Sequence, residues 1–315
     1  MKTITKATEV VIASSQNGEE KPNRLKVIKT YKIYVGGKFP RTESGRYYTP
    51  KNSEGHSLGN ICLCSRKDFR DAVVAARSAF AGWSGTAPFT RSQILYRMAE
   101  MLEGRKAQFI EELQRQGSSL KEANYEVEIS IDRLIYYAGW CDKYQQIFSS
   151  VNPVASSHFN FSVCEPTGVV SILAPEENSL IGLVSVIAPA IAGGNTCVVL
   201  ASENKPLCAV TFAEVLNTSD VPGGVVNILT GKKSELHEQF SSHMDVNAIV
   251  YCGIEEEVIK SIQIKSANNV KRALIRKNIN WLNDSAQSPY FILDTQEVKT
   301  TWHPVENIGG GGGGY

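Results

Sequence analysis

Apolar runs alternate with helix-like segments over residues 168–275, and this alternation most constrains the fold. The runs begin at Gly168, Thr196, Gly224, Asn247 and Arg272. Most are short and continuously apolar, as are the strands of a parallel sheet that is covered on both faces. Because crossovers between parallel strands are right-handed, the pattern predicts an α/β fold. We expect a Rossmann-like parallel sheet with helices on both faces.

Helical periodicity dominates residues 65–148. Ser65 and Asp68 form a capping-box pattern that predicts the start of a helix. Apolar residues then recur at helical spacing, at Phe69, Val73, Ala76, Phe80 and Trp83. A second helix is predicted after Thr90, and a third carries an apolar face from Val127 to Cys141. These faces indicate core packing.

Residues 157–164 show the alternation of a strand. Phe159, Phe161 and Val163 alternate with polar neighbours, so one face is apolar and the other is polar. This pattern predicts an exposed or edge strand that can pair with another element or another subunit.

The two ends of the chain have the composition of flexible segments. Residues 1–30 are mostly polar, and Gly309–Gly314 is a glycine run. We therefore expect a flexible arm or linker over residues 1–30 and a flexible tail over 305–315.

Charge and composition argue against several classes of partner. The 33 basic and 32 acidic residues leave a net charge of +1, which gives no electrostatic case for nucleic acid. No apolar run is long enough for a transmembrane helix, and no secretory signal is visible. The 7 cysteines lie mostly in apolar runs, which indicates reduced, buried thiols in a cytoplasmic protein. Cys62 and Cys64 lack the spacing of a zinc set, so no metal site is expected.

Several motifs, in order over residues 31–275, resemble those of the NAD(P)-dependent aldehyde dehydrogenases. They are Gly36-Gly-Lys-Phe39, the helical stretch 68–83, Glu165-Pro-Thr-Gly-Val-Val170, Ala188-Pro-Ala-Ile-Ala-Gly-Gly-Asn-Thr196 and Val221-Pro-Gly-Gly-Val-Val-Asn-Ile-Leu-Thr-Gly231. The resemblance implies a cofactor-type domain over 31–275 that includes an oligomerisation hairpin at 150–165.

The last strand-like segment also resembles this family. Residues 289–301 are similar to the family's C-terminal oligomerisation strand, which normally follows the catalytic domain. Here only a bridge over 276–288 separates the cofactor-type domain from an oligomerisation strand at 289–304. The chain is therefore identified as a truncated member without the catalytic domain. It is similar to the second, degenerate copies in the two-domain family-16 aldehyde dehydrogenases.

The catalytic groups that the resemblance would require are missing. The family's nucleophilic thiol lies in the absent domain, and Cys252 is interpreted as a small buried residue. Glu177 stands where the family places its oxyanion-stabilising asparagine, and Asn178 lies one position away. Residues 274–278 lack the glutamate of the family's general base. No catalytic residue is therefore predicted.

Three positions of the family's cofactor site survive. Glu203 is retained where the family binds ribose, although Ala201 stands in for the accompanying lysine. Gly231 and Gly253 are also retained, but Glu255–Glu257 follow where small residues would receive a pyrophosphate. Glu203, Gly231 and Gly253 are thus predicted remnants of a cofactor site. No cofactor is expected unless this remnant still accepts NAD or NADP.

The sequence favours a non-catalytic, aldehyde-dehydrogenase-like subunit that serves oligomerisation or protein interaction. Its expected partner is a second copy or a full-length aldehyde dehydrogenase. The alternative is an NAD(P)-dependent aldehyde dehydrogenase component whose active site is completed by another chain. A small-molecule sensor that uses the remnant cleft is a third possibility, with no motif in its favour.

Overall fold

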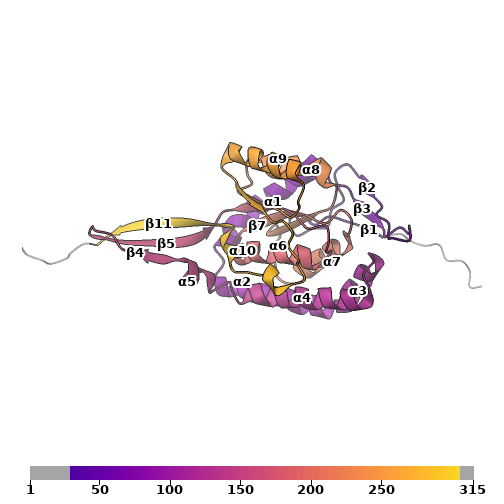
Figure 1. Cartoon of the computed structure of the whole chain (residues 1–315), viewed down its shortest axis with the longest axis horizontal. Coiled ribbons are helices and arrows are strands. Elements are labelled where there is room, and N and C mark those ends of the chain that lie inside the picture. Colours follow the sequence, from indigo (N-terminus) through magenta and orange to yellow (C-terminus); the bar gives the residue numbers. More distant parts are fainter. Residues whose placement is uncertain (1–28, 306–315) are drawn as a thin grey trace, which may run out of the picture.

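The computed structural model describes residues 29–305 and divides into a layered α/β body and a projecting β arm (Figure 1). The arm extends from one end of the body as a narrow sheet. The predicted flexible segments, apart from residues 29, 30 and 305, lie outside the described residues.

The body is built around the predicted parallel sheet, whose strand order is β10-β9-β6-β7-β8. The strands are β6 (Val169–Leu173), β7 (Thr196–Leu200), β8 (Val226–Leu229), β9 (Ala248–Tyr251) and β10 (Arg272–Ile275). Every residue of β6 to β9 is buried, as their continuous apolar character requires. The strand order reverses beside β6, because β7 and β8 lie on one side and β9 and β10 on the other. In such sheets the carboxyl edge at the reversal is the usual position of a ligand.

Helices cover both faces of this sheet, which confirms the predicted fold class (Figure 1). One layer contains α2 (Pro88–Gly104), α3 (Lys106–Arg115), α4 (Leu120–Ala138), α6 (Ile181–Ala192) and α7 (Leu207–Asn217). The other contains α1 (Arg66–Ser84), α8 (Lys233–Ser242) and α9 (Glu256–Ser266). Val170 packs into the first core and Val169 into the second, since successive strand residues point to opposite faces. Within residues 29–305, no helix combines the length and the hydropathy needed to cross a membrane.

The structure confirms the predicted cap of α1 and revises the next helices. The Ser65 side chain accepts from the Asp68 N–H, and the Asp68 carboxylate accepts from the Ser65 N–H. Helix α2 begins at Pro88, ahead of the predicted start after Thr90. Pro88 suits the first helical turn because its missing N–H would have no helical partner there. Helix α3 was not predicted.

Three short strands precede α1 and form a small sheet of order β1-β3-β2. They are β1 (Thr30–Tyr31), β2 (Tyr47–Tyr48) and β3 (Asn60–Cys62). β1 pairs with β3 in parallel and β2 pairs with β3 in antiparallel fashion.

The arm contains β4 (Ser150–Asn152), β5 (His158–Pro166) and β11 (Gln296–Pro304) in the order β11-β5-β4. The segment predicted to be an exposed or edge strand is therefore the central strand, because β11 pairs along the whole length of β5. The short helix α5 (Tyr144–Phe148) leads into the arm from the body.

The polar face of β5 is the buried one. The Asn152 amide donates to Asn160 Oδ1 at 2.6 Å and to Ser162 Oγ at 2.9 Å. The hydroxyls of Ser162 and Thr300 are 2.8 Å apart and also hydrogen-bonded. Side chains from all three strands thus hydrogen-bond to one another on this face, and the apolar face of β5 is turned outward.

The bridge 276–288 is a packed segment that lies against α6. It contains a short 3-10 turn, η2 (Asp284–Ala286), and is followed by α10 (Tyr290–Leu293). The Trp281 side chain is 3% exposed and belongs to the same core as α6. Residues of the bridge therefore bury apolar surface that α6 would otherwise expose.

Arg133 of α4 holds the bridge in place. Its side chain is completely buried, and Nη1 donates to the Ala286 carbonyl at 3.0 Å and to Ser185 Oγ at 2.6 Å. Nη2 donates to the carbonyls of Trp281 and Asn283, both at 3.2 Å. One guanidinium thus satisfies backbone carbonyls at three positions of the bridge.

Replacing Arg133 should release the bridge. We expect Arg133→Ala to lower the free energy of unfolding by about 2–4 kcal/mol, because buried carbonyls lose their donors. Chemical denaturation measures this. The matched control is Arg97→Ala on α2, where the arginine is about half exposed and makes a surface ion pair with Glu100. A loss no larger than that of the control would contradict the assigned role.

A buried carboxylate near β1 should make stability depend on pH. Burial raises the pKa of Glu112 to about 7, although the Thr211 hydroxyl donates to its carboxylate at 2.8 Å. Since the folded pKa exceeds the unfolded one, its stabilising contribution is complete below the unfolded pKa and is lost as the pH rises through about 7.

We therefore expect the free energy of unfolding to fall by about 1–3 kcal/mol between about pH 4.5 and about pH 8. Glu112→Gln should abolish this part of the slope, whereas Glu111→Gln, at an exposed neighbouring position, should keep it. Urea denaturation at several pH values measures the slope. Equal slopes in Glu112→Gln and the unmodified chain would exclude Glu112 as its source.

Candidate functional site

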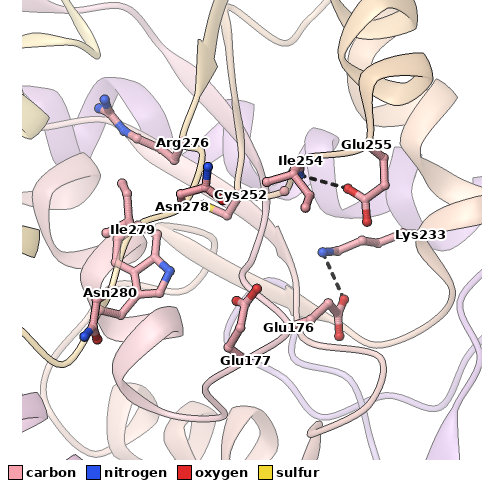
Figure 2. Close-up of a pocket in the computed structure, with 12 residues that line it drawn as sticks. Glu176, Glu177, Lys233, Cys252, Ile254, Glu255, Arg276, Asn278, Ile279 and Asn280 are labelled. Atoms are coloured by element: carbon pink, nitrogen blue, oxygen red, sulfur yellow. Dashed lines mark hydrogen bonds and ion pairs between the residues drawn. The ribbon is translucent and has the colours of Figure 1, made fainter.

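A cleft of about 370 Å³ lies at the carboxyl edge of the sheet, where the strand order reverses (Figure 2). Its walls come from the loops after β6 and β9, from Lys233 at the start of α8, and from the bridge. The lining residues are Glu176, Glu177, Lys233, Cys252, Gly253, Ile254, Glu255, Arg276, Asn278, Ile279, Asn280 and Trp281. The bridge thus forms one side of the most plausible ligand site of this fold.

An ion pair crosses the cleft. Lys233 Nζ lies 3.0 Å from Glu176 Oε1 (Figure 2). Glu176 Oε2 accepts from Ser202 Oγ at 2.7 Å and from the Glu203 N–H at 2.9 Å. Glu176 therefore ties the loop after β7 to the loop after β6. Sequence reasoning missed Glu176, because its contacts join loops that lie far apart in the chain.

A second polar pair closes over Gly253. The Tyr251 hydroxyl donates to the Glu255 carboxylate, and the Ile254 N–H donates to the same oxygen at 3.1 Å. A Cβ atom at Gly253 would lie 2.5 Å from the Tyr251 hydroxyl oxygen and 2.6 Å from Glu255 Oε2. Burial and the neighbouring Glu255 raise the pKa of Tyr251, and the hydrogen bond from Tyr251 lowers the pKa of Glu255. The space above Gly253 is therefore filled by side chains of the same loop and strand.

The structure places the three predicted cofactor residues along one sheet edge but does not bring them into one cavity. Glu203, Gly231 and Gly253 follow β7, β8 and β9 respectively, and of these Gly253 lines the cleft. The Glu203 carbonyl accepts from the Tyr48 hydroxyl at 3.2 Å. Gly231 has φ +156°, and a Cβ atom there would lie 3.3 Å from the Cys64 nitrogen.

These contacts do not fit the pyrophosphate of a dinucleotide. Such a group needs free N–H donors and room at the N-terminus of the helix after the strand. Glu255 precedes α9 and already accepts from the Ile254 N–H, while the Glu256 carboxylate pairs with Lys277 at 2.7 Å. The carboxylates of this turn would also repel phosphate, so no step is assigned to a dinucleotide here.

The cysteine in the cleft is not an activated nucleophile. The Cys252 side chain is 6% exposed, and burial raises the pKa of its thiol to about 12. Because the thiolate is the reactive form, a thiol with this pKa is largely inert near neutral pH. All 7 cysteines are buried and free of disulfides, in agreement with the sequence expectation. Among the residues that the structure describes, no 3 His, Cys, Asp or Glu side chains are grouped as metal ligands.

Glu177, at the family's oxyanion-donor position, and its neighbour Asn178 have different surroundings. The Glu177 side chain is exposed and points into the cleft (Figure 2), while its backbone carbonyl accepts from Lys205 Nζ at 2.7 Å. Asn178 does not line the cleft. Burial raises the pKa of the neighbouring Glu126 carboxyl, although the Leu180 and Ile181 N–H groups donate to it at 2.8 and 3.1 Å. The cleft thus presents a carboxylate where stabilisation of an alkoxide would require a donor.

Comparisons with known proteins agree with this architecture. A model of the aldehyde dehydrogenase family matches residues 39–295. DhaS of Bacillus subtilis (strain 168), described as a putative aldehyde dehydrogenase, is 32% identical to this chain over 275 residues. The alignment covers 86% of this chain and 53% of DhaS. The cytosolic 10-formyltetrahydrofolate dehydrogenase of Xenopus tropicalis is 31% identical over 265 residues, covering 81% of this chain and 29% of that protein.

Solved structures show the same fold. The NAD⁺ complex of the Bacillus cereus aldehyde dehydrogenase aligns with a TM-score of 0.75 and 24% identity, over 79% of this chain and 51% of that one. The chain therefore spans about half the length of DhaS and of this structural neighbour. The family match covers most of the described residues and includes the whole parallel sheet. This chain belongs to the aldehyde dehydrogenase family.

Proposed function

We propose that this chain is a non-catalytic aldehyde-dehydrogenase-like subunit that serves assembly through its β arm. The observation that carries the proposal is the outward apolar face of the arm. Val151 is 67% exposed and Phe159 is 47% exposed, and Phe161 and Val163 lie on the same face. A shallow hollow of about 330 Å³ lies over these residues. Exposed, contiguous apolar surface of this kind marks an interaction site.

The cleft supports the non-catalytic part of the proposal. Its thiol is buried and protonated, and Glu177 occupies the position of the expected oxyanion donor. The Tyr251–Glu255 and Glu176–Lys233 pairs use the donors and space that a cofactor would need. Chemistry on an aldehyde would need a nucleophile, a base and an electron acceptor, and the cleft provides a good match for none of these.

The second candidate function is that of an NAD(P)-dependent aldehyde dehydrogenase component whose active site is completed by another chain. A catalytic domain supplied by a second chain would have to approach the cleft past the bridge. Trp281 of the bridge is buried, and Arg133 binds the bridge at three carbonyls. The bridge therefore already forms one wall of the cleft, and a second chain would have to reach the cleft from another side.

A cytoplasmic location is part of the same proposal. Buried thiols without disulfides are typical of proteins in a reducing compartment. Fractionation of the native host should recover the chain with cytoplasmic markers.

Millimolar NAD or NADP should not bind to this chain. Titration calorimetry should give no saturable heat, and the melting temperature should not change, because Glu255 and Tyr251 fill the space above Gly253. A saturable heat that disappears in Glu203→Ala would instead favour the enzymatic alternative. Glu203 suits this control because its backbone carbonyl, which the substitution retains, makes the contact with Tyr48.

The chain should self-associate or bind a full-length aldehyde dehydrogenase. Sedimentation velocity should give a species heavier than the 34.6 kDa monomer, in the chain alone or mixed with such an enzyme. Phe159→Asp combined with Phe161→Asp should weaken this association at least tenfold, since each change places a charge on the apolar face. Val74→Asp, at a 58% exposed position on α1, is the control and should have little effect. Monomer in both experiments would refute the proposal.

A further inference from the structure

The cleft at the carboxyl edge of the sheet has the size of a small-molecule site. Its volume of about 370 Å³ falls within the range of such sites, about 300–1,000 Å³. Cys252 and Trp281 line it and are 6% and 3% exposed, so part of the wall is apolar and rigidly packed. A ligand in this cleft would therefore be shielded from much of the solvent.

Most charged side chains of the cleft already have partners. Lys233 pairs with Glu176 at 3.0 Å, and Arg276 pairs with Asp294, which does not line the cleft. The Glu255 carboxylate accepts a hydrogen bond from β9. These groups therefore compensate one another, or are compensated by neighbouring elements, within the chain.

Glu177 is the exception among these charged side chains. It is exposed, and it points into the cleft (Figure 2). Lys205 Nζ donates to its backbone carbonyl at 2.7 Å rather than to its carboxylate. Within residues 29–305, the Glu177 carboxylate has neither an ion-pair partner nor a hydrogen-bond donor. Its negative charge is thus available to a ligand.

A second unpaired polar group belongs to Trp281. Its indole N–H makes no hydrogen bond within the described part of the chain, although the side chain is 97% buried. The nitrogen is nevertheless not fully enclosed by protein atoms. The larger open space beside Trp281 is the cleft, since the other cavity that it lines measures about 20 Å³. Buried indole N–H groups usually have an acceptor, which a ligand in the cleft can provide.

We propose that the cleft binds a small protonated amine that also carries an uncharged oxygen acceptor, as amino sugars and amino alcohols do. The ammonium group pairs with Glu177, and a hydroxyl or carbonyl oxygen accepts from the indole N–H of Trp281. The ligand therefore spans from the loop after β6 to the bridge. It is bound and not converted, so this site goes beyond the proposed assembly function.

The charge of the walls selects the amine over other small ligands. Three carboxylates and two cations line the cleft: Glu176, Glu177, Glu255, Lys233 and Arg276. Because both cations are already paired, an anionic ligand would find no free counter-charge in this lining. An uncharged ligand would cover Glu177 without pairing it, which is unfavourable. A protonated amine neutralises this carboxylate and donates a charge-assisted hydrogen bond to it.

Three probes separate the two contacts. D-Glucosamine and D-glucose differ by an ammonium group in place of one hydroxyl, and cyclohexylamine keeps the ammonium group but has no oxygen. Each is titrated calorimetrically into the full chain at about pH 6, below the pKa of an amine. Glucosamine should bind saturably at millimolar concentration. Glucose should bind about tenfold more weakly or less, and cyclohexylamine about threefold more weakly, since each lacks one hydrogen bond.

Matched variants assign the contacts to residues. Glu177→Gln keeps the size of the side chain and removes its charge, so it should weaken glucosamine about tenfold and leave glucose unchanged. Glu111→Gln, at an exposed position on α3 outside the cleft, is the control and should leave glucosamine binding unchanged. Trp281→Phe removes the N–H and should abolish the preference for glucosamine over cyclohexylamine. The melting temperature of each variant without ligand shows whether its fold is retained.

The possible results either support or overturn the site. An absence of saturable glucosamine binding overturns it, and so does equal affinity for glucose. Full affinity in Glu177→Gln, or the same loss in Glu111→Gln, overturns the role of the carboxylate. A preference for glucosamine over cyclohexylamine that persists in Trp281→Phe overturns the indole contact. Binding that is lost selectively in Glu177→Gln supports the proposal.

These results are also separate from those on assembly. A chain that binds glucosamine and sediments as a monomer would support the amine site and refute the assembly function. A chain that associates and binds no amine would do the reverse. The two proposals concern different parts of the molecule, the cleft and the arm, so each can fail without the other.

Discussion

The apolar helix α6 must be buried on every side, and the bridge, held by the guanidinium of Arg133, shares this cover with the sheet and with α2 and α4. Every residue of α6 is buried. The bridge that covers it is held through the carbonyls of Trp281, Asn283 and Ala286, which would be costly to bury without donors. This contact lets the chain pass directly from the cofactor-type domain into the arm. Both halves of the architecture therefore depend on one buried cation.

The packing of the bridge on α6 also shapes the cleft. The bridge supplies one wall, and charged side chains on the opposite walls are used internally: Lys233 with Glu176, and Glu255 with Tyr251. The turn before α9, where a dinucleotide's phosphates would need free N–H donors, therefore carries carboxylates with partners of their own. In contrast, the arm exposes apolar side chains, among them Phe159 and Trp302. Exposed apolar side chains gather on one face of the arm, which is why the proposed function is placed there.

Local patterns predicted much of this fold. The cap formed by Ser65 and Asp68 depends on residues three positions apart, and the buried strands follow from short apolar runs, so both are readable in sequence. The role of β5 was misjudged because its second neighbour, β11, lies more than a hundred residues later in the chain, and alternation alone cannot tell a central strand from an edge. The Glu176 contacts were missed because they join loops after different strands. Glu203, Gly231 and Gly253 each follow a strand of the parallel sheet, but their separation into different surroundings could not be read from the motifs.

The sequence by itself determined that this chain forms a covered parallel sheet of the aldehyde dehydrogenase type, since periodicity and family motifs are carried by neighbouring residues. It also located the short bridge between the sheet and the last strand. Only the tertiary structure decided that the bridge packs on α6, that Tyr251 and Glu255 fill the space above Gly253, and that β11 is the terminal strand of the arm. These features arise from contacts between residues far apart in the chain, where burial and strand order determine which polar groups find partners.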